Sequence, residues 1–283
     1  MVKRSNKSTN QQNRAQRTER KTSNRQNRQR DDHDAPGNEG ADDQFIFGKH
    51  AVETALGQDK DYNKLYVQSG LDNSDTHHIL RLAKSRNIPV QVAPKVKLNE
   101  LSNHGVHQGF VLTQAAFDYA SVADIFANAE KKQEQPFIII LDGIEDPYNF
   151  GSIIRSADAA GAHGIIIPKH RSVTLTGTVA KVSTGAIEKV PVARVTNLTR
   201  EIGELKEKGV WIFGTDVTGT SYTNWQPDVP LALIIGNEGK GISPLVKKQV
   251  DEMLTIPMYG DVQSLNASVA AGLMLFEVAR KRH

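Results

Sequence analysis

Short aliphatic runs, separated by turn and helix patterns, restrict the fold of this chain more than any other feature of its sequence. The second half contains five of them, at 137–141, 164–168, 210–215, 231–235 and 253–257. Short, almost wholly apolar runs are typical of parallel strands that are buried on both faces. A helical pattern follows the first run, over about 150–160, and another follows the last, over about 267–282. This alternation predicts an α/β fold with a mostly parallel sheet, in which ligands bind at the carboxyl ends of the strands.

The first half contains a smaller α/β pattern. Helical periodicity covers 49–56 and 77–86, and strand-like runs cover 64–67, 89–92 and 109–114. We therefore predict a small domain at 44–120, a linker at 121–135 that begins with a helix, and a second domain at 136–283.

The first 43 residues differ in composition from the rest of the chain. They contain ten Lys or Arg, seven Asp or Glu and no aromatic residue, and they account for the whole net charge of +3. So few apolar side chains cannot offset the entropy lost on ordering, so we predict a disordered basic tail at 1–43. A solvated leader and an arm that binds RNA phosphates are both compatible with this composition.

Composition also excludes several classes of function. The chain has no cysteine, which excludes disulfides, thiolate zinc sites and cysteine nucleophiles. No apolar run approaches the ~20 residues that span a bilayer, and no apolar stretch follows the basic N-terminus. We expect a soluble, cytoplasmic protein. The pairs His77–His78 and His104–His107 lack clustered acidic ligands, so no metal site is expected.

Three loops that follow predicted strands contain polar side chains suited to a site. In the first, Asn149 is placed to cap the next helix and Gly151 permits close approach to the backbone, while Arg155 lies among apolar residues. A guanidinium in such surroundings needs a partner, or else an extended side chain that reaches solvent. In the second, Glu238 lies within a glycine-rich loop and suits a cationic or hydroxyl-bearing ligand. In the third, Ser264 or Asn266 can cap the last helix.

Together, the three loops resemble a known family. The patterns N-x-G-x-x-x-R at 149–155, I-G-N-E-G-x-G-I at 235–242 and I-P-M…S-L-N-A-S at 256–268 resemble the three motifs of the SpoU/TrmH family. These proteins are RNA ribose 2′-O-methyltransferases of the SPOUT superfamily. The stretches F-G-K-H-A-V at 47–52 and H-Q-G-F-V at 107–111 resemble the ends of the substrate-binding domain in the subgroup that methylates guanosine in large-subunit (23S) ribosomal RNA.

The resemblance implies a fold, a cofactor and site residues. The second domain would be a SPOUT domain with a deep trefoil knot, preceded by a small RNA-binding domain related to ribosomal proteins. S-adenosylmethionine would be the cofactor, RNA the substrate and a homodimer the assembly, with no metal and no membrane. Four residues would be catalytic: Arg155, Asn149, Glu238 and Asn266. The cofactor would contact Thr215, Gly236, Asn237, Gly241, Ile256, Met258, Ser264, Leu265, Asn266 and Ser268.

The roles implied for these residues leave the general base open. Asn149 and Asn266 would orient the ribose and Arg155, and Glu238 would hold Asn149 or Arg155. Arg155 would act at the 2′-hydroxyl, either as a base or through an adjacent phosphate. A transfer-RNA 2′-O-methyltransferase of the same family and a non-catalytic RNA-binding or ribosome-assembly factor are the alternatives.

Overall fold

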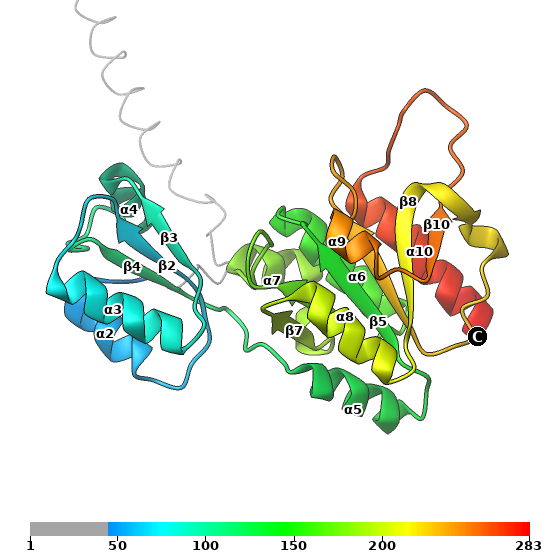
Figure 1. Cartoon of the computed structure of the whole chain (residues 1–283), viewed down its shortest axis with the longest axis horizontal. Coiled ribbons are helices and arrows are strands. Elements are labelled where there is room, and N and C mark those ends of the chain that lie inside the picture. The colour runs from blue at the N-terminus through cyan, green and yellow to red at the C-terminus, as the bar shows by residue number, and fades with distance from the viewer. Residues whose placement is uncertain (1–44) are drawn as a thin grey trace, which may run out of the picture. The chain divides into compact units, whose positions relative to one another are not determined.

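The computed structural model describes residues 45–283, which contain two separate sheets (Figure 1). The predicted disordered tail at 1–43 lies outside the described residues. Within them, no helix is long and apolar enough to cross a membrane.

The first sheet has four strands in the order β1-β4-β2-β3. Its strands are β1 (Phe45–Phe47), β2 (Tyr62–Gln68), β3 (Val90–Ala93) and β4 (Phe110–Gln114), and its helices are α2 (Lys49–Leu56), α3 (Ser74–Ser85) and α4 (Lys95–Leu101). Helices α2 and α3 bury Val52 and Ile79 against one face, while α4 buries Leu98 against the other. The predicted small α/β unit is therefore present, with β1 and α4 in addition.

The second sheet has six strands, all parallel, in the order β10-β8-β9-β5-β6-β7. Its strands are β5 (Phe137–Asp142), β6 (Gly164–Pro168), β7 (Val192–Val195), β8 (Trp211–Ser221), β9 (Leu231–Gly236) and β10 (Glu252–Thr255). All five predicted runs are strands. The predicted parallel sheet is confirmed, and β7 is a sixth strand that the sequence pattern does not predict.

Helices cover both faces of this sheet. They are α5 (Val122–Lys132), α6 (Pro147–Ala159), α7 (Gly177–Ser183), α8 (Leu198–Glu207), α9 (Pro244–Lys247) and α10 (Ala267–Arg282). Helices α6, α7 and α10 pack on one face in a core that contains Phe150, Val179 and Met274. Helices α5, α8 and α9 cover the other face, with Ile125 and Ile202 in its core.

The order of the strands creates a point where the chain changes direction across the sheet. From β5 the chain proceeds to β6 and β7 on one side, and it returns through β8 and β9 on the other. Strands β5 and β9 are therefore neighbours, paired from Phe137 with Leu231 to Asp142 with Gly236. In open α/β sheets ligands bind outside the carboxyl ends of strands at such a point, so the ends of β5 and β9 mark the candidate site.

Candidate active site at the carboxyl ends of β5 and β9

The loops that leave β5 and β9 are joined by hydrogen bonds. The side chain of Asn237 donates from Nδ2 to the carbonyl of Gly143 at 3.0 Å. In the other direction, Oδ2 of Asp142 accepts from the backbone N–H of Ser243 at 2.7 Å. These two bonds fix the position of the glycine-rich loop relative to the end of β5.

Three of the four predicted catalytic residues form one hydrogen-bonded chain. Asn266 donates from Nδ2 to Oδ1 of Asn149 at 2.9 Å, and Asn149 donates from Nδ2 to Oε1 of Glu238. Asn149 lies in the first turn of α6, Glu238 in the loop after β9, and Asn266 at the start of α10. This chain joins the three motif loops, which lie far apart in the sequence, at one place.

The direction of this chain is set by the end of α10. Oδ1 of Asn266 accepts from the backbone N–H groups of Ser268 and Val269, at 2.9 and 3.4 Å, as a helix cap. Its amide NH2 must therefore face Asn149, whose own NH2 then faces Glu238. A carboxylate only accepts hydrogen bonds, so it ends the chain. The predicted capping role of Asn266 is confirmed, and Glu238 holds Asn149 rather than Arg155.

The glycine-rich loop is closed by its own backbone. Asn237 and Gly241 exchange two backbone hydrogen bonds, at 3.1 and 2.8 Å. Oδ1 of Asn237 also accepts from the N–H groups of Gly239 and Lys240. A Cβ on Gly236 would lie 2.4 Å from the carbonyl carbon of Gly241, so this position requires glycine. Asn237 uses its side chain to shape the loop.

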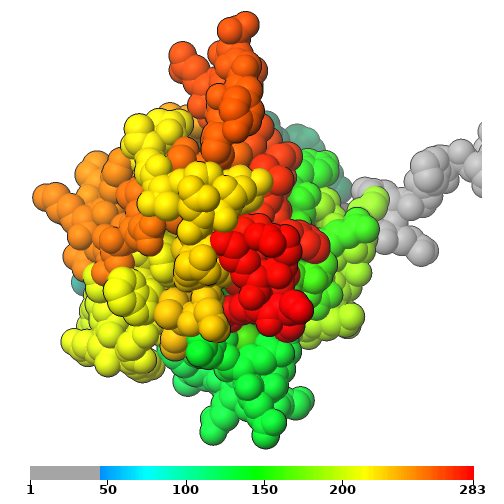
Figure 2. Space-filling view, turned by 90° about the vertical axis from the view of Figure 1, so that its right-hand side faces the viewer, coloured from blue at the N-terminus to red at the C-terminus, as the bar shows by residue number. Residues whose placement is uncertain are grey.

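The other predicted cofactor residues lie on β8 and around the segment after β10. Thr215 donates from Oγ1 to the carbonyl of Ile234 at 3.2 Å, which ties β8 to β9. Ile256 and Leu265 are half-buried, while Met258 and Ser264 are exposed. Figure 2 shows this segment (orange) projecting from the surface. Ser268 donates from Oγ to Oδ1 of Asn266 at 2.6 Å, so it extends the capping network.

Arg155 is placed differently from the other three predicted catalytic residues. It lies in the third turn of α6 on an exposed face, and it forms no hydrogen bond or ion pair with any residue between 45 and 283. Of the two possibilities that the sequence leaves open for Arg155, the internal partner is therefore absent among residues 45–283. Its guanidinium reaches solvent, which was the other possibility in the sequence.

Two residues of the first loop have roles that differ from those predicted. Asp146, not Asn149, caps α6, because its Oδ1 accepts from the N–H groups of Tyr148 and Asn149 at 2.6 and 3.2 Å. The dipeptide Asp146–Pro147 is a signal for a helix start and could have revealed this. At Gly151, a Cβ would lie 2.6 Å from Cβ of Val182. The close approach there is that of α7, a neighbouring helix.

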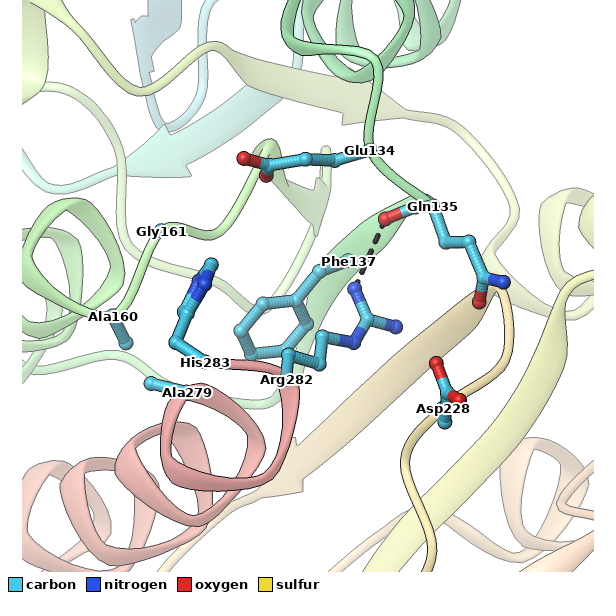
Figure 3. A pocket seen from close by; sticks show the side chains of 9 residues that line it. All are labelled: Glu134, Gln135, Phe137, Ala160, Gly161, Asp228, Ala279, Arg282 and His283. Atoms are coloured by element: carbon cyan, nitrogen blue, oxygen red, sulfur yellow. Dashed lines mark hydrogen bonds between the residues drawn. The ribbon is translucent and has the colours of Figure 1, made fainter.

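A cavity at the opposite end of β5 is not part of this site. It has a volume of about 170 Å³ and lies beside Phe137, Asp228 and Arg282 (Figure 3). Arg282 donates to the carbonyls of Gln135, Pro227 and Val229. These bonds fasten the last turn of α10 to the chain before β5 and β9, so we assign this region to stability.

The histidine pairs do not form a metal site in the described part of the chain. No group of three or more His, Asp or Glu side chains between residues 45 and 283 could hold a metal ion. His78 contacts Glu53 at 3.0 Å and His77 contacts Asp72 at 2.9 Å. His107 is buried and contacts Oδ1 of Asn99 at 2.9 Å.

Two family profiles match the chain. The SpoU rRNA methylase family matches residues 136–276, and the substrate-binding domain of RNA 2′-O ribose methyltransferases matches residues 45–120. The first range contains all three motif loops and the second contains the four-stranded sheet.

Full-length relatives and solved structures agree with these profiles. The Bacillus subtilis protein YacO, assigned to the TrmH family of tRNA/rRNA methyltransferases, is 50% identical over 240 residues, which cover 84% of this chain and 96% of YacO. A Staphylococcus aureus protein assigned to the same family is 49% identical over 243 residues, covering 86% and 98% of the two chains.

Among solved structures, an rRNA methyltransferase from Sinorhizobium meliloti superposes with a TM-score of 0.51 at 26% identity, covering 85% of this chain and 88% of its own. The SpoU methyltransferase AviRb from Streptomyces viridochromogenes, solved with S-adenosylmethionine, superposes at 0.53 and 24% identity, covering 86% and 91%. The motif loops, the parallel sheet and these relatives show that the chain belongs to the SpoU/TrmH family of S-adenosylmethionine-dependent RNA methyltransferases.

Proposed function

We propose that this protein methylates a ribose 2′-hydroxyl in RNA, and that its substrate is a guanosine of large-subunit (23S) ribosomal RNA. The hydrogen-bonded chain from Asn266 through Asn149 to Glu238 is the observation that carries the proposal. It unites the three motif loops in the arrangement that a single active site requires. The location proposed for this activity is the cytoplasm.

The residues at the carboxyl ends of β9 and β10 suit S-adenosylmethionine. The cofactor carries a sulfonium cation and ribose hydroxyls, and it supplies an activated methyl group when bound. Glu238, which is half-buried, offers a carboxylate to the cofactor from the glycine-rich loop. Half-buried Ile256 and Leu265 offer apolar contacts. We propose that these residues and the other predicted cofactor residues form the pocket, together with the trefoil knot that the family resemblance implies.

Methyl transfer requires the 2′-oxygen to be aligned with the methyl carbon and to lose its proton. Asn149 is held from both sides, by Asn266 and by Glu238, so it is rigid enough to orient a ribose. A guanidinium is a cation with donors and no acceptor, and therefore a contact with a phosphate next to the reacting nucleotide is the easier role for Arg155. When bound, S-adenosylmethionine would supply the methyl group and leave as the thioether S-adenosylhomocysteine, while the proton of the 2′-hydroxyl would pass to solvent beside the guanidinium of Arg155.

A homodimer is part of the proposal because Arg155 forms no bond within residues 45–283 and α10 exposes apolar side chains. Val269, Leu273 and Phe276 lie four and three residues apart on α10 and are 51, 39 and 52% exposed. Helix α10 packs against α6, which bears Arg155. A second copy that covers this apolar stripe would also supply a partner site for Arg155.

The domain organisation is proposed from the same observations. The four-stranded sheet would bind RNA as a domain at 44–120, joined by a linker at 121–135 to the methyltransferase domain at 136–283. The match to a substrate-binding profile over 45–120 supports this division. The match to the SpoU rRNA methylase family over 136–276 supports the ribosomal RNA assignment. The relatives are assigned to tRNA/rRNA methyltransferases, which keeps transfer RNA as the second candidate substrate.

A survey of RNA classes tests the substrate. Labelled S-adenosylmethionine is incubated with the full-length protein and undermethylated large-subunit, small-subunit or transfer RNA. Label in large-subunit RNA alone supports the proposal. Label in transfer RNA alone selects the second candidate, and no label in any of the three contradicts both.

A further inference from the structure

A second cavity lies apart from the motif loops and has a volume of about 370 Å³. This volume lies within the range of roughly 300–1,000 Å³ that is usual for small-molecule sites. It is large enough to hold a single nucleotide unit. All the residues that line it belong to the same compact unit of the chain.

The lining of this cavity has two chemical parts. Aliphatic surface comes from Leu80 of α3, from Ile88 in the connection between α3 and β3, and from Val90 of β3. Lys84, Lys169 and His170 supply nitrogen donors, and the lining contains no Asp or Glu. An apolar surface beside cationic groups is suited to a ligand with a flat apolar part and an anionic part.

Lys169 is a cation without an ion-pair partner within 4 Å among the described residues. Burial, followed by the charge of Arg194, lowers its pKa, and Asp61 offsets this only in part. The guanidinium of Arg194 is hydrogen-bonded to backbone, because it donates to the carbonyls of Tyr62 and Asn63 at 2.8 and 3.4 Å. An anion beside Lys169 would therefore relieve an unfavourable electrostatic environment.

The position of the cavity connects it with the active site. Lys169 and His170 directly follow β6, and the N–H of Lys169 donates to the carbonyl of Val195 at the end of β7. Strand β6 is the neighbour of β5, and all strands of this sheet are parallel. The basic rim thus lies at the same edge of the sheet as the three motif loops.

We infer that this cavity binds one unstacked nucleotide of the RNA substrate, with its base against Leu80, Ile88 and Val90 and its phosphate on the lysines of the rim. The inference rests on the proposed RNA methyltransferase function and adds a second recognition point, separate from the methylated nucleotide. Sequence-specific RNA recognition commonly uses bases that are turned out of a single-stranded loop. A free mononucleotide has the same chemistry and is distinguished by the test below.

Two exposed positions allow the test without disturbing the fold. Lys84→Ala removes a cation from the rim, and Val90→Asp places a carboxylate where the base would lie. Lys131→Ala is the matched control, because Lys131 is an exposed helical lysine at the other end of β5. The probe is whichever RNA the wild-type protein labels, and the measurements are Kd at several salt concentrations together with KM and kcat.

Lys84→Ala should weaken RNA binding roughly threefold to tenfold and make the slope of log K against log salt shallower by about 0.7. Val90→Asp should weaken it about tenfold, the size of one lost base contact. In both variants KM for RNA rises and kcat is retained, while Lys131→Ala matches the wild type.

Two outcomes overturn the inference. Wild-type Kd and salt slope in both variants, on an RNA that is still methylated, would show that the cavity does not bind RNA. Binding of guanosine or uridine monophosphate that is lost in Val90→Asp, while RNA binding is unchanged, would assign the cavity to a free nucleotide. Failure of the proposed function is distinct, since it would appear as no methylation by the wild type.

Discussion

Asn149 can perform its role only because its amide has one orientation. It accepts from Asn266 and donates to Glu238, and the helix cap at Asn266 sets this direction. Asn149→Asp has almost the same shape but cannot donate, and it places two carboxylates in contact. We predict a loss of kcat/KM of about 100-fold or more and a loss of stability of ~1–3 kcal/mol. Steady-state kinetics and denaturant unfolding would measure the two effects.

Adding Glu238→Gln to that variant supplies the control. The new amide at position 238 could donate to the new carboxylate at position 149, so this hydrogen bond is restored with its direction reversed. The bond donated by Asn266 keeps its direction. The double variant should regain most of the lost stability. If it is as unstable as Asn149→Asp alone, the assigned direction of the chain is incorrect.

Arg155 should affect catalysis and not folding. Its side chain is exposed and forms no bond within residues 45–283, so Arg155→Ala should change stability by less than ~0.5 kcal/mol. Methyl transfer should fall at least ~100-fold, with nearly unchanged affinity for S-adenosylmethionine. Arg200→Ala, at an exposed arginine on α8, is the control for surface charge. A large loss of stability in Arg155→Ala would make the arginine structural.

At the scale of single residues, the sequence predicts which side chains belong to the site better than it predicts which groups they contact. The resemblance of the three motifs to a known family groups Asn149, Glu238 and Asn266, and the hydrogen bonds between these residues agree with that grouping. The prediction missed Asp146 as the cap of α6, although the Asp146–Pro147 signal is present in the sequence. The sequence does not show that Arg155 is exposed. Exposure depends on which face of α6 meets α10, and that contact joins residues about 120 positions apart.

At the scale of helices and strands, the close packing of α6 on α7 can be tested most directly. A Cβ at Gly151 would lie 2.6 Å from Cβ of Val182, whereas nothing lies within 4 Å of one at Gly203 in α8. Gly151→Ala should therefore destabilise the protein by ~1–3 kcal/mol. Gly203→Ala should stabilise it by ~0.5–1 kcal/mol, because alanine favours the helix. Equal effects in thermal unfolding would contradict this account of Gly151.

A buried histidine makes the start of β5 sensitive to acid. His163 accepts from the N–H of Phe137 at Nδ1, at 2.9 Å, and its Nε2 lies 3.0 Å from Glu134. Burial, followed by the charge of Lys132, lowers its pKa, against the opposing effect of Glu134. The unfolded chain then binds the proton at a higher pH than the folded protein does. Stability should fall as the pH drops below the ordinary histidine value of about 6.5.

Substitution isolates this contribution. His163→Gln should be less stable than the wild type at pH 7 but should lose less stability between pH 7 and pH 5. The exposed His77, replaced by Gln, is the control. His107 acts in the same direction in the other sheet, since burial and Lys95 lower its pKa, so some acid sensitivity should remain. An unchanged pH profile in His163→Gln would exclude His163 as the sensitive group.

The elements predicted from sequence are those with long or uniform patterns. All five aliphatic runs became strands, and the helix at 49–56 has the predicted bounds. The sequence pattern between β6 and β8 does not predict β7, α7 or α8. Strand β7 has only four residues and α7 only seven, and such short elements are set by packing more than by periodicity.

At the scale of the whole molecule, the apolar stripe on α10 should hold two copies together. Leu273→Asp should convert a dimer into a monomer, as measured by light scattering, and should abolish methyl transfer. A monomeric wild type would contradict the proposed assembly.

Mixing two inactive variants tests whether each site needs both copies. If Arg155 of one copy serves the Asn149–Glu238 site of the other, a mixed dimer of Arg155→Ala and Asn149→Asp contains one intact site. Activity should then return after subunits exchange, to a substantial fraction of the wild-type rate. No recovery, with exchange verified, would place Arg155 and Asn149 of the same copy in one site.

The central claim is that the three motif loops form a site for methyl transfer to a ribose hydroxyl, and the position of the transferred methyl group tests it most directly. RNA labelled by the wild-type protein is digested with alkali, which cannot cleave next to a methylated 2′-oxygen. We predict that the label appears in a single alkali-resistant dinucleotide and is absent when Asn149→Asp replaces the wild type. Label in mononucleotides alone would show that the methyl group is on a base, and it would contradict the assignment of ribose chemistry to this site.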